Sequence, residues 1–79
     1  MSIILNLYGT SHCHLCEQAE SLLHTAANDG NISWAFIEIA DDETLLNLYE
    51  CKIPVLKRMD NNCELSWPFS LDDIVNLIQ

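Results

Sequence analysis

Glycine, proline and basic residues are scarce in this sequence. Its 79 residues include two Gly and two Pro, which argues against a flexible linker or a low-complexity segment. Three Lys and Arg stand against twelve Asp and Glu, giving a net charge of −9. Nucleic-acid binding needs a basic surface, and an anionic membrane surface would repel this chain. We therefore expect no nucleic-acid partner and no membrane partner.

Long hydrophobic segments are missing too. No apolar run approaches the roughly 20 residues that span a bilayer, and the N-terminus lacks the basic region and apolar core of a secretory signal. With 49% hydrophobic residues, the chain can still bury a core. We expect a single domain over residues 1–79, cytoplasmic and monomeric.

What the sequence does contain is cysteine, four times in 79 residues. A small extracellular protein would use four cysteines as a disulfide framework, but the extracellular context is missing here. In a reducing compartment the same residues more often serve redox catalysis or metal binding.

The pattern of apolar residues predicts the element order β-α-β-α-β-β-α. An apolar run at residues 3–8 predicts a strand covered on both faces. A helical stripe follows at Leu15, Ala19, Leu22, Leu23 and Ala26, and residues 28–30 close that helix. A second strand is predicted at 32–39. A short helix begins near 41–43, and its apolar side consists of Leu45, Leu46, Leu48 and Tyr49. A hairpin of 55–59 and 63–67 follows, and the last helix is capped by Ser70 and Asp73. A helix between the first two strands implies a parallel pair, so the fold class is α/β with a four-stranded mixed sheet flanked by helices.

Cys13 and Cys16 lie at the predicted turn between the first strand and the first helix. Residues three apart share one face of a helix, so the two sulfurs can meet in a small disulfide loop. A helix N-terminus favours a thiolate, which makes Cys13 the better nucleophile and leaves Cys16 to resolve the mixed disulfide. His12 and His14 could support the thiolate or move a proton, or they could be plain loop residues.

Other interpretations of the cysteines stay open. Cys13 and Cys16 could be core residues, or they could bind zinc with a histidine, although no second pair of ligands has metal-binding spacing. We expect no metal site, and keep a metal-delivery module and an adaptor with idle cysteines as alternative functions. Cys51 and Cys63 are predicted to fill the core, with a second disulfide or resolving thiols as the alternatives.

Several segments together resemble the thioredoxin superfamily, in particular its short glutaredoxin-like branch. They are Tyr8-Gly9-Thr10-Ser11-His12, the Cys13-x-x-Cys16 pair and Ile53-Pro54-Val55, in the element order given above. The resemblance covers essentially the whole chain and implies a thioredoxin-like βαβαββα fold. It implies thiol–disulfide exchange by Cys13 and Cys16 on a protein or small-molecule disulfide. It also implies a cis peptide bond before Pro54 and a backbone at Ile53 that pairs with an extended substrate.

The resemblance raises glutathione as a co-substrate, with no resident cofactor. Lys52 is the basic residue best placed to hold a glutathione carboxylate. The chain departs from the glutathione-using glutaredoxins, because Ser66-Trp67-Pro68-Phe69 stands where they carry a Gly-Gly pair and an acidic residue. The net charge also opposes this anionic tripeptide. Trp67 could contact the substrate instead, or pack under the last helix, which is the interpretation we favour.

Overall fold

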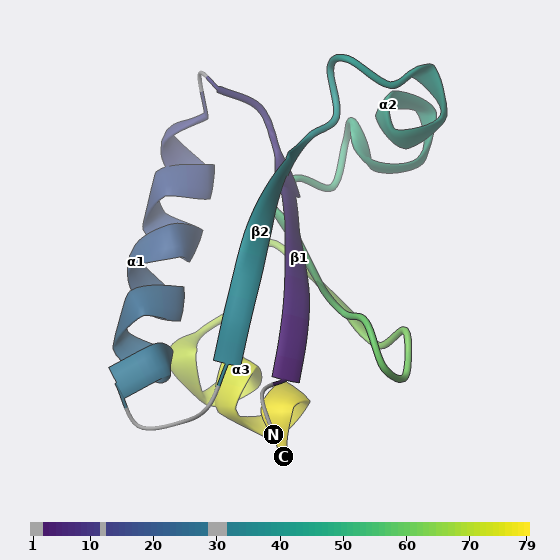
Figure 1. Ribbon diagram of the computed structural model, residues 1–79. Helices are drawn as coiled ribbons and strands as arrows, with labels where there is room; N and C mark the ends of the chain where they lie inside the picture. The colour runs from purple at the N-terminus through teal and green to yellow at the C-terminus, as the bar shows by residue number, and fades with distance from the viewer. Residues whose placement is uncertain (1–2, 12, 29–31) are drawn as a thin grey trace.

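The computed structural model describes residues 3–11, 13–28 and 32–79. In these residues it has four strands and three helices in the predicted order (Figure 1). Their bounds are β1 Ile3–Gly9, α1 His14–Asn28, β2 Ile32–Glu38, α2 Glu43–Tyr49, β3 Val55–Arg58, β4 Glu64–Ser66 and α3 Leu71–Ile78. The predicted α/β fold class with a four-stranded mixed sheet is confirmed.

The sheet has the strand order β2-β1-β3-β4. β1 pairs with β2 in parallel, from Ile3 opposite Ile32 to Gly9 opposite Glu38, and it pairs with β3 antiparallel. Because β1 and β2 run in the same direction, their C-terminal ends lie at the same end of the sheet. The turn that carries Cys13 follows β1 at this end, so both strands support it (Figure 1).

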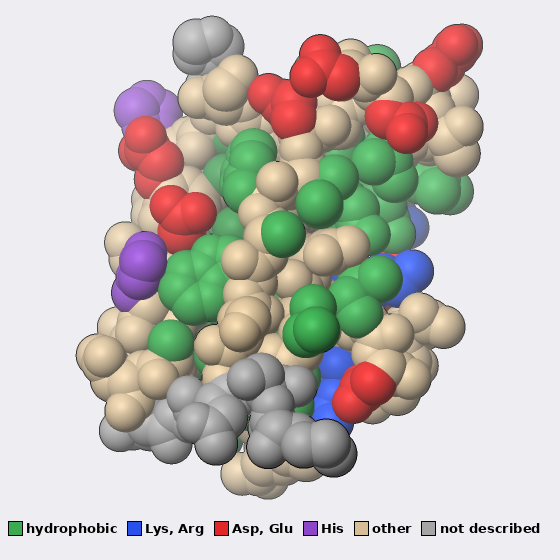
Figure 2. Space-filling model, viewed as in Figure 1, with side chains coloured by type: hydrophobic (Ala, Val, Ile, Leu, Met, Phe, Trp, Pro, Cys, Tyr) green, Lys and Arg blue, Asp and Glu red, His purple; other side chains and the backbone are tan. Residues whose placement is uncertain are grey.

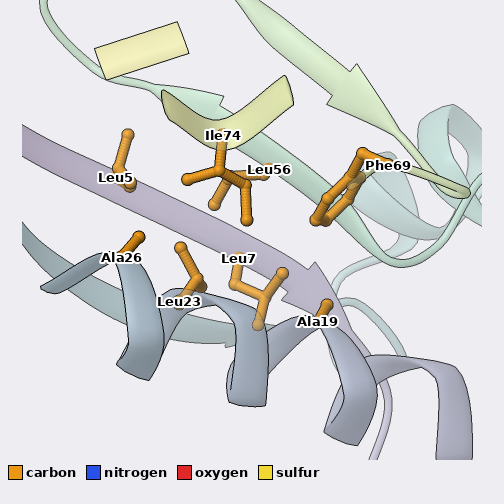
Figure 3. Close-up of a cluster of buried hydrophobic side chains, with 8 residues drawn as sticks. All are labelled: Leu5, Leu7, Ala19, Leu23, Ala26, Leu56, Phe69 and Ile74. Atoms are coloured by element: carbon orange, nitrogen blue, oxygen red, sulfur yellow. The ribbon is translucent and has the colours of Figure 1, made fainter. Parts of the chain in front are cut away.

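Two clusters of buried side chains hold the helices on the sheet. On one face, Leu7 of β1 packs with Leu23 of α1 and Ile74 of α3, and all three are fully buried (Figure 3). On the other face, α2 packs against Tyr8 and Val55. Burying one such apolar side chain contributes roughly 1.5–3 kcal/mol, so these contacts fix the positions of the helices.

Side-chain caps begin the second and third helices. Asp42 accepts the N–H of Leu45 at the start of α2, and Ser70 and Asp73 form a reciprocal capping box at α3, as predicted. The predicted end of the first helix falls partly outside the described residues, within which α1 runs to Asn28. Among the described segments, none of the helices has the length and apolar character needed to cross a membrane.

Three exposed side chains differ from the prediction. Ile4 is 58% exposed, so the prediction that the first strand is covered on both faces is wrong there, because α2 has seven residues and packs only at the far end of β1. Leu15 is exposed because Cys16, about 100° around the helix, takes the inward position. Leu48 is likewise exposed, whereas its neighbour Tyr49 is buried.

Candidate functional site

The Cys13–Cys16 pair lies at the turn from β1 to α1. Cys13 is half-buried and directly precedes α1, whereas Cys16, in the first turn of the helix, is 4% exposed. The two Cα atoms are 5.2 Å apart, a separation that a disulfide spans, and the two sulfurs lie near disulfide distance. The pair therefore combines one accessible and one shielded sulfur, which does not fit the interpretation that both are buried core residues.

Cys13 also caps α1. Its carbonyl accepts the N–H of Glu17 at 3.2 Å, and its Sγ accepts the N–H of Cys16 at 3.1 Å. A side-chain oxygen usually fills this role at the start of a helix; here a sulfur does. A thiolate accepts such a hydrogen bond better than a thiol, and the helix dipole favours negative charge at this position. The Sγ of Cys13 therefore lies where the start of a helix supplies an N–H donor.

Gly9 lets the pair lie against the sheet. A Cβ atom at Gly9 would lie 2.6 Å from the Sγ of Cys16 and 3.2 Å from the ring of Phe36, so a larger residue does not fit without a shift. Sequence analysis did not assign this role to Gly9. The available signal was a glycine, one of two in the chain, at the end of a strand and just before the cysteine motif.

Pro54 lies across the sheet from Gly9. β1 and β3 pair with Tyr8 opposite Val55, and one further step in this antiparallel register sets Pro54 opposite Gly9. The Ile53–Pro54 peptide bond is cis, and Pro54 is buried. The two segments singled out from the sequence, Cys13–Cys16 and Ile53–Pro54, are therefore at the same end of the sheet.

Trp67 is close to Pro54 through its backbone. Its N–H donates to the carbonyl of Pro54 at 3.0 Å. Its ring is half-buried, packs on the core cluster beneath α1 and α3 and lies edge-on to Phe69. The ring therefore packs beneath the last helix, as the favoured sequence interpretation expected.

Two further candidate residues, His14 and Lys52, lie at the surface. His14 is exposed, with its Nδ1 3.6 Å from the carboxylate of Glu17. Lys52 is exposed in the turn that follows α2. His12 lies outside the described residues. Among the residues that the structure describes, neither His14 nor Lys52 has a buried partner that would fix the orientation of its side chain.

A pocket of about 180 Å³ opens beside the cysteine pair. Its lining comes from Thr10, Ser11, Cys13, Cys16, Glu17, Glu20 and Phe36. Acidic side chains gather at this end of the molecule, over the start of α1 and near α2, whereas basic side chains lie toward the β3–β4 hairpin (Figure 2). The surroundings of the pair thus favour a cationic group over an anionic one.

Cys51 and Cys63 are free and exposed, so the prediction that they fill the core is wrong. Cys51 lies in the turn after α2 and Cys63 in the connection between β3 and β4, where the backbone turns toward solvent. Neither residue lines the pocket beside Cys13. Within residues 3–11, 13–28 and 32–79, no three Cys, His, Asp or Glu side chains converge into a metal site.

These features together define a class of protein. A sheet of order β2-β1-β3-β4, a Cys-x-x-Cys pair at the start of its first helix and a cis proline at the same end are those of a small thioredoxin-like protein of the glutaredoxin type. The glutaredoxin-like domain family (DUF836) matches residues 4–79. The chain belongs to this family, and the predicted resemblance is confirmed.

Solved structures agree with this assignment. A structural-genomics target protein from X. campestris is 34% identical over 92% of each chain, with a TM-score of 0.79. A protein from Nitrosomonas europaea is 28% identical over 98% of this chain and 92% of its own, with a TM-score of 0.86. Thioredoxin 1 from Thermosipho africanus, 15% identical over 95% of this chain and 89% of its own with a TM-score of 0.71, shows the fold alone. No curated protein matches the chain.

Proposed function

We propose that this protein is a thiol–disulfide oxidoreductase in which Cys13 attacks the substrate disulfide and Cys16 resolves the intermediate. The observation that carries the proposal is the difference between the two sulfurs. The Sγ of the half-buried Cys13 accepts an N–H at the start of α1, whereas Cys16 is 4% exposed. Two-step exchange needs an accessible, stabilised thiolate and a shielded second thiol.

The exchange proceeds in two displacements. The Cys13 thiolate attacks one sulfur of the substrate disulfide; the bond between the substrate sulfurs breaks, and the second sulfur leaves as a thiolate that takes up a proton. Cys16 then loses its proton and attacks the Sγ of Cys13. This forms the Cys13–Cys16 disulfide and releases the first substrate sulfur as a thiol. An external dithiol, or two thiol molecules in turn, then returns the two electrons and two protons to the pair and is itself oxidised to a disulfide.

Ile53 and Pro54 supply the docking site in this proposal. The N–H of Ile53 already donates to the carbonyl of Tyr49 at 3.1 Å, so the carbonyl of Ile53 is the group offered to an extended substrate segment. Lys52 directly precedes Ile53 and is exposed, the exposed His14 follows Cys13, and the Trp67 N–H donates to the carbonyl of Pro54; we propose that Lys52 and His14 contact the docked substrate.

The acidic pocket bears on the substrate class. Glutathione carries two carboxylates and one ammonium group, and Glu17 and Glu20 line the pocket beside Cys13. Lys52 is the one basic side chain that we place near the docking site. We therefore propose a protein or small-molecule disulfide without surplus negative charge as substrate, and glutathione as a poor co-substrate.

Trapping of mixed disulfides tests the proposal. In a background with Cys51→Ser and Cys63→Ser, the Cys16→Ser variant should accumulate a mixed disulfide on Cys13, seen by intact mass. The matched Cys13→Ser variant should not accumulate one on Cys16. Equal trapping by both variants, or by neither, would contradict the proposal. A stoichiometric metal that is lost in Cys16→Ser would instead identify a metal-binding module.

A further inference from the structure

Glu38 is the residue that connects the cysteine turn to the sheet. Its Oε1 accepts the backbone N–H of Ser11 at 3.0 Å, across 27 positions of sequence. Glu38 is the last residue of β2 and pairs in register with Gly9, after which Ile39 donates its N–H to the carbonyl of Gly9 at 3.0 Å. The carboxylate thus continues the contacts between β1 and β2 one step past the end of the ladder.

Other hydrogen bonds near the turn are local. The bonds that Cys13 accepts come from Cys16 and Glu17, which belong to the helix that Cys13 itself begins. Among the described residues, only Glu38 joins the segment from Thr10 to Cys13 to a distant part of the chain by a hydrogen bond. This hydrogen bond therefore ties Ser11 to the end of β2.

The second carboxylate oxygen of Glu38, Oε2, is buried without a hydrogen-bond donor among the described residues. Leaving a buried acceptor unsatisfied costs about 1–3 kcal/mol, and such groups in native proteins call for an explanation.

We infer that Glu38 is a positioning residue for Cys13, acting through the backbone of Ser11, and that its charge restrains the acidity of the Cys13 thiol. The inference rests on the proposed function, in which Cys13 is the attacking thiol. The hydrogen bond keeps Cys13 where its Sγ meets the N–H of Cys16, which favours the thiolate. The Glu38 carboxylate contacts the backbone two residues before Cys13, and its negative charge acts in the opposite direction, because a carboxylate disfavours a second anion close to it.

Four residues at position 38 separate the two effects. Glu has the charge and the reach to Ser11, Asp has the charge with a shorter reach, Gln has the reach without the charge, and Ala has neither. The measurement is the pH dependence of Cys13 alkylation in the fully reduced protein, followed on the Cys13 peptide by mass. The other titratable side chains beside Cys13 are the same in all four proteins: Glu17 and Glu20 line the pocket, and His14 follows Cys13 in the sequence.

We expect Glu38→Gln to move the alkylation midpoint to lower pH than in the native protein, because the charge is gone and the amide oxygen still accepts from Ser11. Glu38→Ala should lie at higher pH than Glu38→Gln, because the anchor is lost, and Glu38→Asp should lie above the native protein for the same reason. If Glu38→Ala does not fold, the comparison of Asp with Glu gives the effect of the anchor.

Glu20 provides the matched control. It is a carboxylate beside the same pocket, and in the described part of the chain its side chain makes no hydrogen bond to the turn. Glu20→Gln and Glu20→Ala should therefore have the same alkylation midpoint as each other, in contrast to the two variants at position 38.

The outcomes separate this inference from the proposed function. Suppose that Glu38→Gln and Glu38→Ala have the same alkylation midpoint, and that Glu38→Asp has the midpoint of the native protein. This result would overturn the role of Glu38 even if Cys13 is activated. An ordinary cysteine thiol has an alkylation midpoint of about pH 8.5. A native Cys13 with this midpoint would contradict the proposed function instead.

Discussion

The Cys13–Cys16 pair and the two free cysteines, Cys51 and Cys63, have very different surroundings. Cys13 and Cys16 lie at a helix start, with an N–H donor for one sulfur and a glycine that makes room for the other. Cys51 and Cys63 are more exposed, and each lies in a connection rather than at the start of a helix. Exposure alone does not make a reactive thiol; a stabilised thiolate and a close partner do.

A long-range hydrogen bond accompanies each pair. Near the first pair, Glu38 holds the backbone of Ser11. Near the second, the hydroxyl of Tyr49 donates to Glu64 at 2.7 Å and ties the end of α2 to β4. We propose that the Ser11–Glu38 hydrogen bond positions the cysteine turn, whereas the Tyr49–Glu64 hydrogen bond stabilises the fold.

Replacing single cysteines should have the largest effect. Cys13→Ser should abolish exchange with a small aromatic disulfide, because no other thiol has the same stabilisation. Cys51→Ser and Cys63→Ser, singly or together, should leave the rate nearly unchanged. Rates followed by absorbance of the released thiol check this expectation, and a large loss in Cys51→Ser would break the distinction between the pairs.

Gly9→Ala should destabilise the protein by about 1–3 kcal/mol, as overpacking of a close contact does. The new Cβ would meet the Sγ of Cys16 at 2.6 Å, so the yield of the Cys13–Cys16 disulfide should fall as well. Urea unfolding measures the first effect and mass after alkylation the second. Ala35→Val, at an exposed position of β2, is the control and should change neither quantity appreciably.

Charge at the pocket should have a moderate effect. Glu17→Gln with Glu20→Gln should reduce the preference for cystamine over an anionic disulfide of similar size by roughly five-fold, since a surface charge pair is worth about 1 kcal/mol. Raising the salt concentration should narrow the preference of the native protein in the same way. Glu50→Gln, which does not line the pocket, is the control. An unchanged preference in the double variant would show that the pocket does not select the substrate.

Alkaline pH should have the smallest effect, and on stability alone. The hydrogen bond to Glu64, with burial as a second cause, raises the pKa of Tyr49 from 10.0 to about 12. Because the unfolded state loses this proton first, the stabilisation is complete below pH 10 and should be lost between pH 10 and about 12. Tyr49→Phe should remove that part of the pH dependence in urea unfolding while leaving exchange intact. An identical slope in native protein and variant would contradict this assignment.

The fold could be predicted because local signals agreed with one another. The apolar runs, the Asp42 cap and the Ser70–Asp73 capping box each mark one element, and together they give the observed order. Exposure was harder to predict, because it depends on which part of the sheet a short helix covers. Ile4 is exposed for this reason, and Cys63 because it follows a tight turn whose position only the folded hairpin defines.

The site could be predicted only in part. The sequence motif identified Cys13 and Cys16, and the resemblance added Pro54. The space that Gly9 leaves for the Sγ of Cys16 and the hydrogen bond from Ser11 to Glu38 depend on how the turn meets the ends of β1 and β2, which no local sequence pattern encodes. The role of Gly9 and the one inferred for Glu38 therefore rest on contacts seen only in the folded protein.

The most direct test is the redox equilibrium of all four cysteines in one experiment. The native protein is equilibrated in glutathione buffers of increasing oxidising strength, quenched by alkylation and mapped by peptide mass. The account predicts that Cys13 and Cys16 oxidise together to a disulfide with little glutathione adduct, while Cys51 and Cys63 remain free thiols under the same buffers. A Cys13–Cys16 pair that stays reduced and alkylates no faster than Cys51 would contradict it.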